Sequence, residues 1–168
     1  MVKELNLLTL KPLIYVLNTD ELGISEKKEK IALSFSPLRI CAALEAELAG
    51  FSPQERKEFL EEAWIKEPGL PKLIREAYHL LGLLTFYTIK GGKEVHAWPI
   101  KRGTMAVEAA SVVHSDMTRG FIKAEVIKVQ DLLSLGGWQK ARETGKLTLV
   151  GRDYQLNDGD VVEFKFNV

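Results

Sequence analysis

Two polar side chains that follow a short apolar run have the chemistry of a base-recognition site. Residues 13–17 (LIYVL) form the run, and Asn18 and Glu21 follow it in the order Asn-x-x-Glu. Ligands of α/β domains bind beyond the carboxyl ends of the strands. An amide can donate and accept at a purine edge, and a carboxylate accepts from N–H groups. Asn-x-x-Glu is equally the pattern of a helix N-cap with a first-turn acid, so both interpretations stand on these residues alone.

The remaining residues do not supply the chemistry of nucleotide hydrolysis. No Gly-x-x-x-x-Gly-Lys-[Ser/Thr] loop, which would cradle phosphates, occurs in the sequence. His79, His96 and His114 are far apart, and neither they nor the single Cys41 show metal-ligand spacing. A Gly-x-Ser-x-Gly nucleophile elbow is also absent. We therefore predict no catalytic residue, no metal site and no hydrolysis by this chain alone.

Basic side chains are interleaved with aromatic ones in the second half of the chain. Such interleaving can hold RNA through phosphate contacts and base stacking. It also arises when one face of a strand is core and the other is solvated, so this alternative stays open. The side chains that we select as RNA or ribosome contacts are Lys101, Arg102, Arg119 and Lys123.

The elements of the first half are those of an α/β domain. The run at 13–17 predicts a strand covered on both faces, and residues 38–42 predict a second short strand. Residues 43–48 are good helix formers. Ser52-Pro53-Gln54-Glu55 is a capping box with proline at the first helical position, which predicts a helix to about Trp64. Apolar residues at helical spacing predict another helix over 70–81.

The second half predicts a small mixed sheet. Strands are expected at 84–89, 94–100, 121–127, 147–150 and 161–166, with helices at about 104–114 and 130–143, the latter weakened by Gly136-Gly137. This ββαβ-α-ββ order resembles a β-grasp fold. Pro99 lies within the second of these strands and cannot donate a ladder hydrogen bond. We therefore expect that strand at an edge of the sheet.

The composition is that of an ordinary globular chain of 168 residues, 46% hydrophobic and 27% charged. It excludes disordered, collagen-like and disulfide-stapled proteins. Lys+Arg and Asp+Glu number 23 each, so the net charge argues against an overall cationic nucleic-acid binder. No run of about 18 apolar residues predicts a membrane span. One cysteine suits a reducing cytosol, and we expect a cytoplasmic location.

Taken together, ordered blocks of sequence resemble the C-terminal part of the YchF/Obg-like ATPase family of P-loop NTPases. The blocks span nearly the whole chain. In the first half they are LNLLTLKP (5–12), NTDE (18–21), CAALEAEL (41–48) and EPGL (67–70). In the second half they are KEV (93–95), AW (97–98), KRGT (101–104), RGFIKAEV (119–126), GK (145–146), DGDVV (158–162) and FKFNV (164–168).

The resemblance implies an α+β fold, in which the tail of a P-loop G domain (1–82) precedes a TGS domain, a ubiquitin-like β-grasp (83–168). The family replaces the usual Asn-Lys-x-Asp guanine motif with Asn-x-x-Glu, which matches Asn18 and Glu21 and implies a preference for ATP. Cys41, Ala42 and Ala43 match the fifth G-domain motif, where backbone N–H groups contact the base. The phosphate loop and switch regions lie upstream in the family, and we expect the missing G-domain portion to be a partner.

The resemblance further implies a ribosome-associated, translation-linked ATPase. The complete protein is expected to bind ATP, or GTP, with Mg²⁺, whereas this chain alone is expected to bind neither tightly. The TGS domain is expected to dock RNA or the ribosome, with no membrane and no sequence-specific DNA binding. Whether this chain is an enzyme stays open. The members of the family are ATPases, but the phosphate loop that they use is missing here. The alternative is a stand-alone TGS-type interaction module without a nucleotide role.

Overall fold

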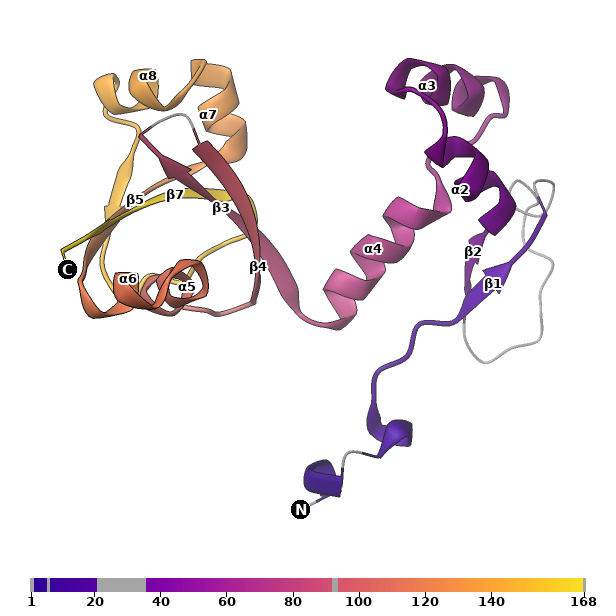
Figure 1. The fold of residues 1–168 in the computed structure, drawn as a ribbon, viewed down its shortest axis with the longest axis horizontal. Helices are drawn as coiled ribbons and strands as arrows, with labels where there is room; N and C mark the ends of the chain where they lie inside the picture. The colour runs from indigo at the N-terminus through magenta and orange to yellow at the C-terminus, as the bar shows by residue number, and fades with distance from the viewer. Residues whose placement is uncertain (1, 6, 21–35, 92–93, 168) are drawn as a thin grey trace. The chain divides into compact units, whose positions relative to one another are not determined.

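The structure of the chain, a computed structural model, describes residues 2–5, 7–20, 36–91 and 94–167 (Figure 1). The chain divides into two compact units, residues 1–80 and 81–168. Each unit has its own buried cluster of hydrophobic side chains, a small one in the first unit and two larger ones in the second.

Within the described ranges, the first unit pairs two short strands and continues in three helices. Two 3₁₀ turns, Val2–Leu5 and Leu8–Leu10, precede β1 (Val16–Asn18), which pairs in parallel with β2 (Leu38–Ile40) (Figure 1). The helices that follow are α2 (Ala42–Ala49), α3 (Pro53–Glu62) and α4 (Gly69–Leu80). Cys41, Leu44 and Leu48 are buried against half-buried residues that follow α2. The second strand and all three helices were predicted from the sequence.

The capping box predicted at the start of α3 is confirmed atom by atom. Ser52 Oγ accepts from Glu55 N, and Glu55 Oε2 accepts from Ser52 N at 2.8 Å. These hydrogen bonds from Ser52 favour the ionised form and lower the pKa of the Glu55 carboxyl. The helix is followed by Trp64, which has a φ of +56° and is 90% exposed.

The prediction of a strand covered on both faces at 13–17 was wrong. The strand is shifted to Val16–Asn18, and Leu13, Tyr15 and Val16 are 61%, 47% and 41% exposed. The physical reason is pairing: within the described residues β2 is the one neighbour of β1, so no second strand or helix layer covers the apolar run. The run has the composition of a buried strand, but the described residues do not supply the neighbours that such a strand needs.

The second unit is built on a sheet of five strands in the order β4-β3-β7-β5-β6. These are β3 (Leu83–Lys90), β4 (Glu94–Lys101), β5 (Phe121–Lys128), β6 (Thr148–Val150) and β7 (Asp160–Phe166). β3 and β7 are parallel, and the other neighbours are antiparallel. The predicted β-grasp order is confirmed, and β4, which contains Pro99, lies at an edge as predicted.

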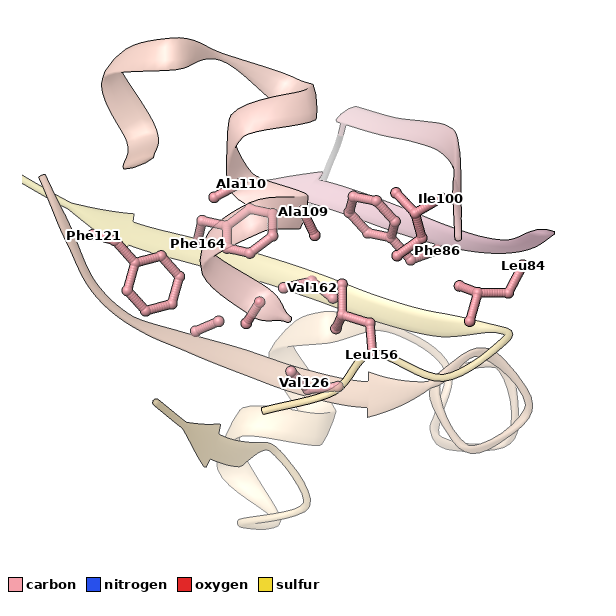
Figure 2. Packing of buried hydrophobic residues seen from close by; sticks show 12 residues of the cluster. Leu84, Phe86, Ile100, Ala109, Ala110, Phe121, Val126, Leu156, Val162 and Phe164 are labelled. Carbon is pink, nitrogen blue, oxygen red and sulfur yellow. The ribbon is translucent and has the colours of Figure 1, made fainter. Parts of the chain in front are cut away.

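Helices lie on both sides of this sheet (Figure 1). One side holds α5 (Ala106–Val113) and α6 (Ser115–Arg119), and the other holds α7 (Val129–Leu135) and α8 (Trp138–Glu143). Figure 2 shows Ala109 and Ala110 of α5 on the side of the sheet that carries Phe86, Val162 and Phe164. The small alanine side chains let the helix approach the sheet closely, which buries these residues almost completely.

Two helix predictions in this unit need correction. The predicted helix at 130–143 is two helices, because Gly136 adopts the left-handed conformation at φ +80° and ends α7. The predicted helix at 104–114 begins at Ala106, and the five-residue α6 that follows it was missed. A helix of five residues is too short to show a hydrophobic period.

A buried carboxylate holds the turn that leads into β7. Asp160 is 1% exposed, and its Oδ2 accepts from the backbone N–H of Asn157 at 2.8 Å. Its Oδ1 accepts no well-aligned hydrogen bond within the described residues but lies 2.6 Å from the ammonium of Lys128. The ion pair therefore compensates the buried charge. The neighbouring Asp158 accepts from Thr85 N of β3 at 2.8 Å, so this turn joins β3, β5 and β7.

Candidate functional site

Asn18 and the start of α2 lie together at the carboxyl ends of two parallel strands. Asn18 pairs with Ile40 in the β1–β2 register, and α2 begins directly after β2. The Asn18 Oδ1 accepts from the backbone N–H of Ala42 at 3.0 Å, although 24 positions separate the two residues. This is the place where α/β domains bind ligands.

Cys41 is the N-cap residue of α2 and faces the core. It is 2% exposed, and its Sγ accepts from Leu44 N at 3.4 Å. The thiol packs among Leu44 and Leu48, so only the backbone of Cys41 is placed to meet a ligand. Ala42 and Ala43, in contrast, are exposed in the first turn of the helix.

Hydrogen-bond donors remain at this helix start. The first N–H groups of a helix have no partner within the helix; here Asn18 accepts from Ala42 N and Cys41 accepts from Leu44 N. The Ala43 N–H donates to no acceptor within the described residues. The Asn18 amide uses its oxygen for Ala42, and its two N–H groups donate to no other described residue, so they can donate to an acceptor atom of a ligand. Donors in this arrangement can contact ring nitrogens or carbonyl oxygens of a base.

Glu21, the other half of the Asn-x-x-Glu pattern, lies outside the described residues. The structure therefore places one member of the predicted pair. The local N-cap alternative involves the same undescribed segment and stays open. What the structure adds is that Asn18 bonds to the start of α2, a helix remote from it in sequence.

The four cations selected as RNA or ribosome contacts are not brought together. Lys101 pairs with Leu83 at the start of β3, and its ammonium donates to Leu81 O at 2.7 Å. Lys123 of β5 pairs with Lys165 near the end of β7. Because β3 and β7 are parallel, Lys101 and Lys123 lie toward opposite ends of the sheet. Arg102 follows Lys101, and Arg119 ends α6 just before β5, so the set separates into two pairs.

A groove that the sequence did not single out lies on the α5 side of the same sheet. It has a volume of about 270 Å³ and is lined by residues of β3, β4, β7 and the α5–α6 segment. Its aromatic members include His96, Trp98 and Phe166. The lining residues are dispersed between positions 88 and 166, which is why no short motif marks the groove. The one available signal was the strand period, which puts His96 and Trp98 on one face of their strand.

The described part of the chain contains neither a cluster of metal-ligating side chains nor a membrane-spanning helix. No group of three or more His, Cys, Asp or Glu residues is arranged to hold a metal ion there. Likewise, none of the helices within the described ranges has the length and apolar character to cross a membrane.

Comparison with known proteins places these observations in a family. The family YchF-GTPase_C, described as a protein of unknown function (DUF933), matches residues 83–167. The "Ribosome-binding ATPase YchF" of Bacillus subtilis is 43% identical over 178 residues, which cover 100% of this chain and 48% of that protein. The protein of the same name from Haemophilus influenzae is 42% identical over 174 residues, with 99% and 48% covered.

A solved structure gives the same result. The Schizosaccharomyces pombe YchF GTPase superposes with a TM-score of 0.83 at 28% sequence identity, covering 98% of this chain and 46% of that one. The chain thus spans about half the length of the relatives that it matches. The resemblance seen in the sequence blocks is confirmed, as is the α+β fold class with a β-grasp after a P-loop tail. The chain therefore belongs to the YchF-GTPase_C family and corresponds to the C-terminal part of its YchF relatives.

Proposed function

We propose that this chain acts as the C-terminal part of a ribosome-associated, translation-linked ATPase. In this proposal the first unit recognises the base of ATP, or more weakly of GTP, and the second unit is a TGS domain that docks on RNA or the ribosome. The cytoplasm is the compartment that such a role requires. The proposal is supported by identity to ribosome-binding ATPases along the whole chain and by the Asn18–Ala42 bond.

The residues at the helix start fit the base of a nucleotide but not its phosphates. The Asn18 amide would donate to a ring acceptor, the Ala43 N–H to a second acceptor, and Glu21 would accept from an exocyclic amino group. Cys41 and Ala42 would hold the helix start in place, through the core and through Asn18. In the complete protein, the nucleotide with Mg²⁺ would supply the phosphoryl-transfer chemistry.

A nucleotide titration of this chain tests whether it contributes base contacts without phosphate contacts. Without a phosphate loop, base contacts alone should give binding of ATP or GTP that is absent or very weak in calorimetry. Micromolar ATP binding would contradict the proposal, because it would require a phosphate cradle in this chain.

The base assignment is tested in a complete relative, at the position that matches Glu21. Replacing Glu21→Asp there should shift the preference from ATP toward GTP, and Asn18→Ala should weaken both nucleotides. Unchanged affinities in both variants would favour the second candidate, an interaction module without a nucleotide role. That second candidate is supported by the β-grasp unit, because this unit has a hydrophobic core of its own.

Ribosome docking is tested by cosedimentation of the full chain with ribosomes at low salt. We expect pelleting that decreases as salt increases, since cations that contact phosphates release counterions. If the chain does not pellet with ribosomes at any of the salt concentrations tested, the docking part of the proposal is wrong. Lys101, Arg102, Arg119 and Lys123 remain the proposed contacts, tested as two pairs because the sheet separates them.

A further inference from the structure

We infer that the groove on the α5 side of the second unit binds an unpaired base of single-stranded RNA, with a preference for bases that carry an exocyclic amino group. The inference deepens the proposed function and rests on it, since it names the chemistry by which the second unit would dock.

The groove presents rings on one face of the sheet. His96 and Trp98 share a face of the edge strand β4, and their ring centroids are 6.5 Å apart. Phe166, at the end of β7, also lines the groove and is 41% exposed. Aromatic side chains on a sheet surface are the platforms on which single-stranded RNA stacks its bases.

The platform is fixed before any ligand arrives. Trp98 Nε1 donates to the Thr88 Oγ1 on β3 at 2.9 Å, and these two strands pair continuously from Leu83 to Lys90. The half-buried indole also packs against the core cluster. Because the Thr88 hydrogen bond and the core contacts already hold the Trp98 ring in place, little side-chain entropy is lost when a base stacks in the groove.

The polar lining suits a base better than a charged peptide. Lys90 and Glu94 are opposite each other in the β3–β4 register and contribute one cation and one anion. Glu163 also lines the groove, but its carboxylate is bound by Arg142 and Lys165. The exposed Glu94 carboxylate can accept from an exocyclic amino group, as carboxylates do from cytosine. The Lys90 ammonium can meet the adjoining phosphate.

A peptide strand added to the edge of β4 is the competing occupant. Pro99 lacks an N–H and would interrupt that pairing. Strand addition takes its affinity from main-chain hydrogen bonds and would give no preference among the bases of an oligonucleotide. The proposal therefore commits to single-stranded RNA, and the two occupants separate in a mutational test.

The test uses the full chain and fluorescein-labelled oligocytidine, oligoadenosine and oligouridine of about 12 nucleotides, a length within the range that single-strand binding modules occupy. Fluorescence anisotropy at low salt should show tighter binding of the cytidine and adenosine oligomers than of oligouridine. His96→Ala should weaken binding of the cytidine oligomer at least about fivefold, from the stacking lost. The matched control is Val95→Ala, also exposed on β4 but on the opposite face, which should change affinity less than about twofold.

Two further variants test the roles of Glu94 and Trp98 separately. Glu94→Gln should reduce the preference for cytidine over uridine while leaving oligouridine binding unchanged. Trp98→Phe keeps a ring in the groove and identifies the Trp98 indole N–H signal in a nitrogen-15 spectrum by its loss. That signal should shift in the wild type on addition of the cytidine oligomer, whereas the indole signal of Trp64, in the first unit, should not.

Three results would overturn the inference. They are equal weakening by His96→Ala and Val95→Ala, an unshifted Trp98 indole signal at saturating RNA, and oligouridine binding as tightly as oligocytidine. If the chain pellets with ribosomes but gives any of these results, the groove assignment fails while docking stands. If it binds the oligomer in the groove but never pellets with ribosomes, docking fails and the groove stands.

Discussion

Asn18 does through space what a capping residue normally does along the sequence. Its amide oxygen accepts from Ala42 N, at the start of a helix that begins 24 residues later. One side chain thereby ties the end of β1 to the start of α2. The same side chain keeps its amide N–H donors for another partner, so a structural role and a binding role are compatible at this residue.

Glu125 is the residue for which the structure gives a pH dependence. Partial burial raises its pKa, but hydrogen bonds and charge attraction from Arg142 and Lys165 lower it by more, so the net pKa lies below the ordinary value of 4.5. A lowered folded-state pKa stabilises the fold above the unfolded pKa, and this contribution is lost as pH falls through the folded value.

We therefore expect Glu125→Gln to reduce the acid sensitivity of the second unit. The free energy of unfolding in urea should fall less between about pH 7 and about pH 3 in the variant than in the wild type. Glu143→Gln, which removes an exposed carboxylate of α8, is the control and should leave the wild-type pH dependence in place. Identical pH profiles for Glu125→Gln and the wild type would show that the Arg142 bridge does not favour the ionised form.

At the scale of elements, the start of β5 and the end of β7 approach at Gly120. Asn167 N donates to Gly120 O at 2.9 Å, and a Cβ at Gly120 would lie 2.0 Å from the backbone oxygen of Asn167. The obstacle is backbone directly after the end of β7, so it cannot turn aside as a side chain would. This position needs glycine for close approach rather than for an unusual φ.

Gly120→Ala should destabilise the second unit by about 2–3 kcal/mol, the upper part of the range for overpacking. Chemical denaturation monitored by circular dichroism measures it. In Gly151→Ala the new Cβ would be 3.3 Å from the end of the Asp153 side chain, which can move, so a change within about 0.5 kcal/mol is expected. Equal effects of the two substitutions would mean that the β5–β7 contact relaxes at no cost.

Elements with a local cause were predictable, and those that depend on neighbours were not. The α3 start follows from Ser52 and Glu55, and the edge position of β4 follows from Pro99, because both effects lie within the element itself. The prediction that β1 is buried was wrong, because burial depends on which other elements pack against a strand. Asn18 was selected from its position after an apolar run, and the family resemblance put Ala42 in the same predicted site. The hydrogen bond between the two became visible only in the structure. The groove could not be predicted because residues of β3, β4, β7 and the α5–α6 segment line it together.

At the scale of the whole molecule, the two units differ in how much apolar surface they bury. Among the described residues, the first unit has a core of Cys41, Leu44 and Leu48 and leaves the apolar residues Leu13, Leu70 and Ile74 at least half exposed. The second unit encloses twelve residues in one of its two clusters. Small cores with exposed apolar surface open more readily.

Limited proteolysis should therefore cut within residues 1–80 and leave the second unit intact. Mass spectrometry of a short trypsin digest should show a resistant fragment that begins close to residue 81. A digest that instead preserves residues 1–80 and degrades 81–168 would mean that the first unit is the more stable of the two.

The environments of the three tryptophans have an optical consequence. Trp64, in the first unit, is already 90% exposed, whereas Trp138 is 5% exposed and Trp98 is half-buried in the second unit. A solvated indole emits at long wavelength whether or not its unit is folded, and a buried indole changes its emission when water reaches it. Tryptophan emission of the intact chain should thus follow the unfolding of the second unit. Unfolding of the first unit should change the same spectrum very little.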